Sequence, residues 1–175
     1  MLYCIGDLAE YTSVVSTQRP DTKIINQSGR LLRMIPRDAP DVITLQGRLK
    51  SGGVLTMNLR EGKPFKGSPG MVWRIYGETG EIELLAQATF AQLGTPVHSL
   101  KLHHFENDVV EEICYDDLMH HKELPPISRN IAALYDNFAD GKTEGYVQWD
   151  EAIRHHELLE GLQKSNETGQ RTHVA

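Results

Sequence analysis

Histidine is the residue type with the most suggestive spacing in this sequence, because six of its eight histidines stand in adjacent pairs. The pairs are His103-His104, His120-His121 and His155-His156. Metal ligands must converge on one point, whereas adjacent side chains point to opposite faces of a strand or diverge by about 100° around a helix. No H-x-x-x-H spacing or matching carboxylate spacing accompanies the pairs. We therefore predict no metal site and expect these histidines at or near the surface.

Carboxylates and nucleophiles also lack a catalytic context. Glu111-Glu112 and Asp116-Asp117 are paired carboxylates of the kind that acid-base catalysis uses, but nothing in the sequence places either pair in a cleft. No serine lies in a Gly-x-Ser-x-Gly sequence, and Cys4 and Cys114 stand far apart in apolar surroundings. We expect solvated carboxylates, buried free thiols and no catalytic residue.

Nucleotide-binding motifs are missing as well. The sequence has neither G-x-G-x-x-G nor G-x-x-x-x-G-K-[ST], so we predict no cofactor-binding residue. The net charge of -6 comes from interspersed acidic and basic residues, which argues against a nucleic-acid partner. No apolar run is long enough for a membrane span or a secretory signal. We expect a cytoplasmic protein, with the nucleus as the alternative location.

A row of polar residues is the most informative candidate site. Residues 41–61 and 71–85 each alternate apolar and polar positions around a glycine-containing turn, which predicts two β-hairpins. In the first hairpin, the apolar row contains Ile43, Leu45, Leu49, Leu55, Met57 and Leu59. The candidate oligomer or partner face contains Arg48, Asn58, Arg60 and, on the next hairpin, Arg74. The alternatives are a solvated face and an interface, where arginines make paired contacts.

The remaining elements must support that sheet. Residues 8–17 predict a strand, 22–40 a mostly irregular connection, and 62–70 a loop rich in Gly and Pro. Residues 98–105 and 108–115 predict a further antiparallel pair, 127–139 and 150–164 two helices, and 171–174 a short edge strand. Trp73 and Trp149 are predicted core anchors. At 175 residues, the chain is expected to form a single α+β domain over 1–175.

The order of these motifs resembles a known family. The Gly6-Asp7 step before a strand, the 49–54 hairpin turn, the W-x-I-x-G-x-x-G-x-I-x-L stretch from Trp73, and the closing helix with Ala152, Ser165 and Gly169 are similar to the C-terminal domain of the Gfo/Idh/MocA (glucose-fructose oxidoreductase, inositol dehydrogenase, rhizopine catabolism) family. Within it, the sequence is nearest the fungal galactose-pathway repressor-like branch.

This resemblance implies a large, mostly antiparallel sheet with helices packed on one face and the other face open for oligomerisation. It implies that NAD(P) is bound by an N-terminal Rossmann domain, which we expect to lie outside these residues together with the catalytic lysine and histidine. Glu61-Gly62-Lys63-Pro64 echoes the family's E-K-P motif but carries an extra glycine, so no catalytic role is assigned to Lys63.

Two functional hypotheses follow from the resemblance. In the first, the chain is the substrate-side and oligomerisation domain of an NAD(P)-dependent sugar or polyol oxidoreductase and is inactive alone. In the second, it is a non-catalytic protein-binding module that resembles the repressor branch. Both predict a homo-oligomer, and the second adds a protein partner.

Overall fold

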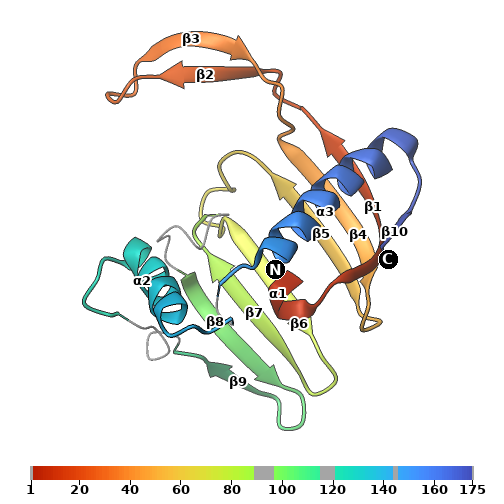
Figure 1. Ribbon diagram of the computed structural model, residues 1–175, viewed down its shortest axis with the longest axis vertical. Coiled ribbons are helices and arrows are strands. Elements are labelled where there is room, and N and C mark those ends of the chain that lie inside the picture. The colour runs from red at the N-terminus through yellow and green to blue at the C-terminus, as the bar shows by residue number, and fades with distance from the viewer. Residues whose placement is uncertain (1, 89–96, 115–120, 144–145, 175) are drawn as a thin grey trace. The chain divides into compact units, whose positions relative to one another are not determined.

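The structure is a computed structural model that describes residues 2–88, 97–114, 121–143 and 146–174 (Figure 1). The chain divides into two compact units. The first contains Met1–Gly62 and Trp149–Ala175, and the second contains Lys63–Gln148. Each unit has its own four-stranded antiparallel sheet, and an α+β fold is confirmed.

The first unit begins with a short helix, α1 (Leu2–Ile5), and a long strand, β1 (Leu8–Ser16). The predicted hairpin follows as β4 (Val42–Leu49) and β5 (Val54–Arg60), and the chain returns through α3 (Trp149–Thr168) and β10 (Thr172–His173). The strand order is β10-β1-β4-β5, and every pairing is antiparallel. The predictions of the first strand, the hairpin, the closing helix and the edge strand are confirmed.

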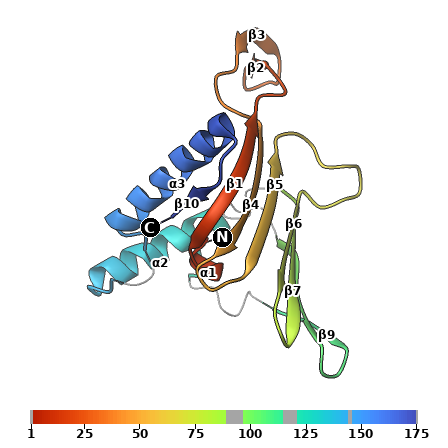
Figure 2. The ribbon, with the colours of Figure 1, turned by 90° about the vertical axis from the view of Figure 1, so that its right-hand side faces the viewer.

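The core of the first unit lies between this sheet and α3. Figure 2 shows α3 on one side of β1, β4 and β5. The buried apolar residues are Leu8, Tyr11, Leu45, Leu55 and Leu162. Of these, only Leu162 comes from the helix. The apolar residues of the 150–164 helix that recur on one side, Ala152, Ile153, Leu159 and Leu162, predict a buried face, and that prediction is partly wrong because Leu159 is 58% exposed. The contacting side of α3 instead includes Leu158, Leu162 and Ser165.

Polar side chains of α3 also protect the outer edge of β1. Strand β10 pairs only with Glu10 and Tyr11, so the backbone of β1 beyond them has no strand on that side. The N–H of Ser13 donates to Ser165 Oγ at 3.3 Å, and the N–H of Val15 donates to Asn166 Oδ1 at 2.9 Å. These side chains accept hydrogen bonds from backbone N–H groups that would otherwise remain unpaired at an exposed sheet edge.

Residues 22–40 are not mostly irregular, and that prediction is wrong. They contain a two-stranded antiparallel hairpin of β2 (Asp21–Ile25) and β3 (Leu31–Pro36). The prolines that suggested irregular structure stand at the last residue of β3 and beyond it, where no ladder hydrogen bond is lost. Gly29 has φ +79° in the connecting turn, a conformation that glycine adopts without strain. We call residues 21–36 the arm.

The second unit contains the sheet β6-β7-β8-β9 and helix α2. Its elements are β6 (Met71–Tyr76), β7 (Gly80–Ala86), β8 (Val97–His104), β9 (Val109–Glu112) and α2 (Pro126–Ala139). These strands and the helix confirm the predictions for 71–85, 98–115 and 127–139. The strands of the two units form separate four-stranded sheets, and residues 62–70 form no strand between β5 and β6, as the Gly- and Pro-rich sequence predicted.

Several predicted buried residues are exposed. Cys4 and Cys114 are both exposed, since Cys4 lies in the single turn of α1 and Cys114 follows the end of β9. Trp149 is 79% exposed at the first residue of α3, so it is not a core anchor. On α2, the apolar residues that recur at helical spacing also face outward, with Ile131 55% and Phe138 69% exposed.

Candidate interface on the open face of the first sheet

The two faces of the first sheet differ in what covers them. Residues paired directly across antiparallel strands share a face. Leu45 pairs with Ser13 and Met57, on the face that α3 covers. The opposite face, which we call the open face, carries the polar row of the hairpin. Its exposed residues on β4 and β5 are Gln46, Arg48, Val54, Thr56, Asn58 and Arg60.

The structure brings three of the four candidate residues onto this open face. Arg48 pairs with Val54, Asn58 pairs with Thr44, and Arg60 pairs with Val42, so all three project from the same side of β4 and β5. This arrangement follows from the alternation of polar and apolar residues, since a one-residue change of register would turn the polar row toward α3.

A carboxylate that sequence analysis missed neutralises part of this face. Glu10 on β1 lies opposite Arg48 and His173 in the strand ladders. Its carboxylate is 2.8 Å from Arg171 Nη1, 3.6 Å from His173 Nδ1 and 3.8 Å from Arg48 Nε. Exposed ion pairs contribute little to stability, so this cluster mainly orients side chains. The polar positions of β1 were the signal for Glu10.

Arg74 lies in the second unit, on a different sheet from the other three candidates. Its Nε and Nη2 donate to Glu83 Oε2 at 2.8 and 2.7 Å. Glu83 also lies opposite Lys101, and Lys101 lies opposite Glu112. The four strands therefore carry a row of directly opposed, alternating charges, which favours this register over its neighbours.

The histidine pairs diverge where they are described. Consecutive residues of β8, His103 and His104, face opposite sides and contact different carboxylates: His103 Nε2 is 2.8 Å from Asp108 Oδ1, and His104 Nε2 is 3.1 Å from Glu111 Oε2. Among the described residues, no three metal-binding side chains come together. His120, Asp116 and Asp117 lie outside the described residues.

His121 links the segment before α2 to the helix. Its Nε2 lies 2.6 Å from Asp136 Oδ2, and its Nδ1 lies 3.4 Å from Glu123 Oε1. The hydrogen bond with Asp136 is the main cause that raises the pKa of His121, and the contact with Glu123 adds to it. This arrangement connects the segment before α2 to the helix through two carboxylate contacts.

One hollow of about 630 Å³ is formed by the 63–69 loop with Leu85 and Gln87. It is lined by two lysines, Lys63 and Lys66, and by Phe65, Ser68 and prolines, with no carboxylate or histidine among them. Acid-base chemistry has no paired groups there. Across the described residues, no helix is long and apolar enough to cross a membrane.

Comparison with known proteins defines the class first. A crystal structure of levoglucosan dehydrogenase in complex with NADH and levoglucosan has a TM-score of 0.67 and 13% identity, covering 99% of this chain and 46% of the enzyme. The described fold is therefore shared with part of that enzyme, and Gfo/Idh/MocA-type oxidoreductases are among the structural neighbours of this chain, as the resemblance predicted.

Closer similarity leads to the regulatory branch. Residues 1–86 match the family described as Gal80p, C-terminal domain. The galactose/lactose metabolism regulatory protein GAL80 of Saccharomyces cerevisiae is 25% identical over 93% of this chain and 46% of its own length. A super-repressor mutant of Saccharomyces cerevisiae Gal80p has a TM-score of 0.77 and 23% identity, covering 96% of this chain and 45% of that protein.

The chain is thus similar to the Gal80p C-terminal-like family over residues 1–86, just under half of its length, and the predicted resemblance is confirmed. The chain spans about half the length of the relatives that it matches.

Proposed function

We propose that this chain is the assembly domain of a Gal80p-like regulatory protein and that it binds a second copy or another protein through the open face of its first sheet. The observation that carries the proposal is the contrast between the two faces of that sheet. One face is covered by α3, whereas the other presents Arg48, Asn58 and Arg60 beside apolar Val54, which is 77% exposed. Planar guanidinium groups beside apolar surface suit protein interfaces.

The similarity to a regulatory protein supports a binding function over catalysis. The relative that covers most of this chain is named for the regulation of galactose and lactose metabolism. A regulator acts where it meets its partners, so we propose a location in the cytoplasm or the nucleus. We also propose that both units belong to one family domain and that any dinucleotide is bound by a domain outside these 175 residues.

Charge reversal on the open face tests the interface. We expect the wild-type chain to sediment as an oligomer at micromolar concentration and Arg48→Glu/Arg60→Glu to raise the dissociation constant at least tenfold, because interface arginines commonly contribute more than about 1.4 kcal/mol. The matched control is Arg154→Glu/Lys164→Glu, which makes the same charge change on exposed residues of α3. An oligomer that persists equally in both variants would refute the interface.

The second candidate is a substrate-side domain of an NAD(P)-dependent sugar or polyol oxidoreductase. The fold shared with levoglucosan dehydrogenase favours it. The intact mass of the native protein comes first: a mass near 19.7 kDa favours the binding module, whereas about twice that mass indicates an additional domain. Reduction of NAD(P) by the longer protein with sugars or polyols would then support the enzyme, and its absence alongside intact assembly would support the regulator.

A further inference from the structure

The arm presents an apolar surface that the first unit leaves uncovered. Within the part of the chain that the structure describes, strands β2 and β3 pair only with each other. Its exposed apolar residues are Ile25 (58%), Leu31 (50%), Leu32 (61%) and Met34 (46%). A two-stranded hairpin alone is marginally stable in water, so both the free strand edges and this apolar surface favour a partner.

Polar contacts fix the base of the arm. Asp41 is 7% exposed, and its carboxylate accepts hydrogen bonds from the N–H groups of Gln18 at 2.7 Å and Arg19 at 3.0 Å. Backbone hydrogen bonds, chiefly that of Gln18, lower the pKa of Asp41. Arg37 pairs with the Glu61 carboxylate, and its Nε donates to Thr22 Oγ1 at 3.0 Å.

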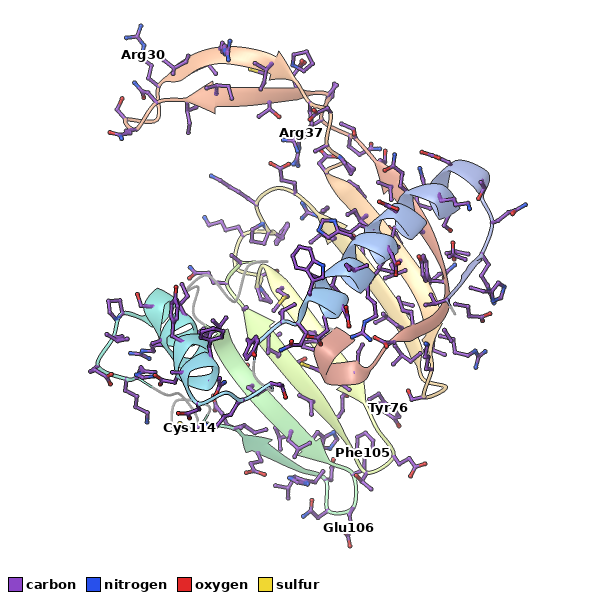
Figure 3. The ribbon with its side chains drawn as sticks, viewed as in Figure 1. Arg30, Arg37, Tyr76, Phe105, Glu106 and Cys114 are labelled. Carbon is purple, nitrogen blue, oxygen red and sulfur yellow. The ribbon has the colours of Figure 1, made fainter. Side chains whose placement is uncertain are left out.

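The tip of the arm is also ordered. Asn26 Oδ1 accepts hydrogen bonds from the N–H groups of Ser28 and Arg30. Figure 3 shows Arg37 at the base and Arg30 near the turn at the other end. An element held at both ends loses less conformational entropy when it binds.

The charge of the arm selects an acidic partner. In a chain of net charge -6, the arm holds three basic residues, Lys23, Arg30 and Arg33, and one acidic residue, Asp21. An acidic segment lies at the edge of the second sheet, where β9 is the last strand of the described sheet. Residues 106–112 contain four acidic residues and no basic one, and the β9 valines are also exposed, Val109 by 50% and Val110 by 58%.

Pairing of like elements is disfavoured at both surfaces. Two β9 edges would bring acidic residues together, and two arms would bring basic residues together, both of which are repulsive. An arm against a β9 edge instead combines opposite charges, exposed apolar side chains and unpaired backbone groups. Figure 3 shows Glu106 at the turn that leads into β9.

We propose that the arm of one copy adds to the β9 edge of a second copy and extends its sheet. Addition of strands to a free sheet edge is a general mode of protein recognition. Each copy contributes one arm and one β9 edge to such an assembly. This contact is separate from the open face and does not depend on it.

Reciprocal charge reversal tests the contact in the whole chain. The arm variant is Lys23→Glu/Arg33→Glu, and the edge variant is Glu106→Lys/Glu111→Lys, which leaves Glu112 opposite Lys101 and the Asp108 carboxylate near His103. Sedimentation velocity should show at least tenfold weaker self-association for each variant alone. An equimolar mixture of the two should regain association, because each arm then meets a β9 edge of opposite charge.

The mixture distinguishes this contact from the proposed open-face interface. The arm variant and the edge variant both keep the wild-type open face, so neither carries acidic residues that could replace the lost contacts of an Arg48→Glu/Arg60→Glu variant. Mixing this open-face variant with either of them should therefore not restore its association. The contact is refuted if the wild-type chain stays monomeric at all concentrations, if only one of the two variants weakens association, or if the mixture associates no better than its components. Far-ultraviolet circular dichroism of each variant establishes that it is folded.

Discussion

Replacement of Gly161 by alanine should destabilise the first unit, although alanine is the better helix former. Gly161 lies on α3 above the ring of Tyr11, which is 2% exposed. A Cβ at position 161 would lie 2.0 Å from the Tyr11 hydroxyl oxygen and 3.3 Å from Tyr11 Cζ. The first separation is far inside van der Waals contact, and the buried ring has little room to move away.

The size of the effect follows from two opposed contributions. Gly→Ala within a helix contributes about 1 kcal/mol of stability by propensity. Overpacking of a core costs about 1–3 kcal/mol, and a 2.0 Å approach belongs at the upper end of that range. We therefore expect Gly161→Ala to lower the free energy of unfolding by about 2 kcal/mol, measured by urea denaturation followed by circular dichroism.

A double-mutant cycle with Tyr11→Phe isolates the cause. Loss of the hydroxyl, which also bonds the Thr172 side chain, should cost about 1 kcal/mol by itself. In that background the nearest ring carbon is 3.3 Å from the new Cβ, so a small shift relieves the contact and Gly161→Ala should cost much less. Equal losses in both backgrounds, or a gain of about 1 kcal/mol in the wild type, would refute the reasoning.

Three other substitutions test the polar contacts. Asp41→Asn should reduce the loss of stability at acid pH. A carboxylate with a lowered pKa contributes stability above its unfolded pKa of about 3.9, and this contribution is lost as pH falls through its folded pKa. Urea denaturation of variant and wild type from pH 3 to 7 measures the difference. His121→Asn should remove a loss of stability that occurs as pH rises. A histidine with a raised pKa contributes stability below its unfolded pKa of about 6.5, and this contribution is lost as pH rises through its folded pKa. Hydrogen exchange of α2 from pH 5 to 8 measures this dependence, and equal profiles for variant and wild type would count against the role of His121. Asn166→Ala should cost about 1 kcal/mol and speed exchange of the Val15 amide, whose unchanged rate would contradict the described edge contact.

The sheet and its faces could be predicted because strand alternation is local information. Leu45 and Arg48 occupy opposite phases of one strand, and the structure places them on opposite faces. The glycine turns set the hairpin ladders in the same way. Arg48, Asn58 and Arg60 therefore share one face of the first sheet, as the alternation predicted, whereas Arg74 lies on the second sheet.

The features that the sequence did not predict depend on distant parts of the chain or on the position of a residue at the end of a strand or helix. The arm was obscured by Pro36, because a proline at the last position of a strand has the same local appearance as one in a loop. Glu10 gains its partners from Arg171 and His173 at the far end of the sequence, which no local pattern reveals. Trp149 is apolar enough for a core, but its place at the first residue of α3 leaves it exposed.

The division of the chain also sets an order of folding. The second unit is continuous in sequence, so all its strands are available once residue 148 has been synthesised. The first unit closes only when α3 and β10 return to β1, through contacts such as Ser13 with Ser165 that span 152 positions. Loops of that length form slowly. During synthesis the second unit should therefore fold first, while the edge of β1 that later contacts β10 and α3 remains unpaired. In this interval the chain is most prone to aggregation and to chaperone binding.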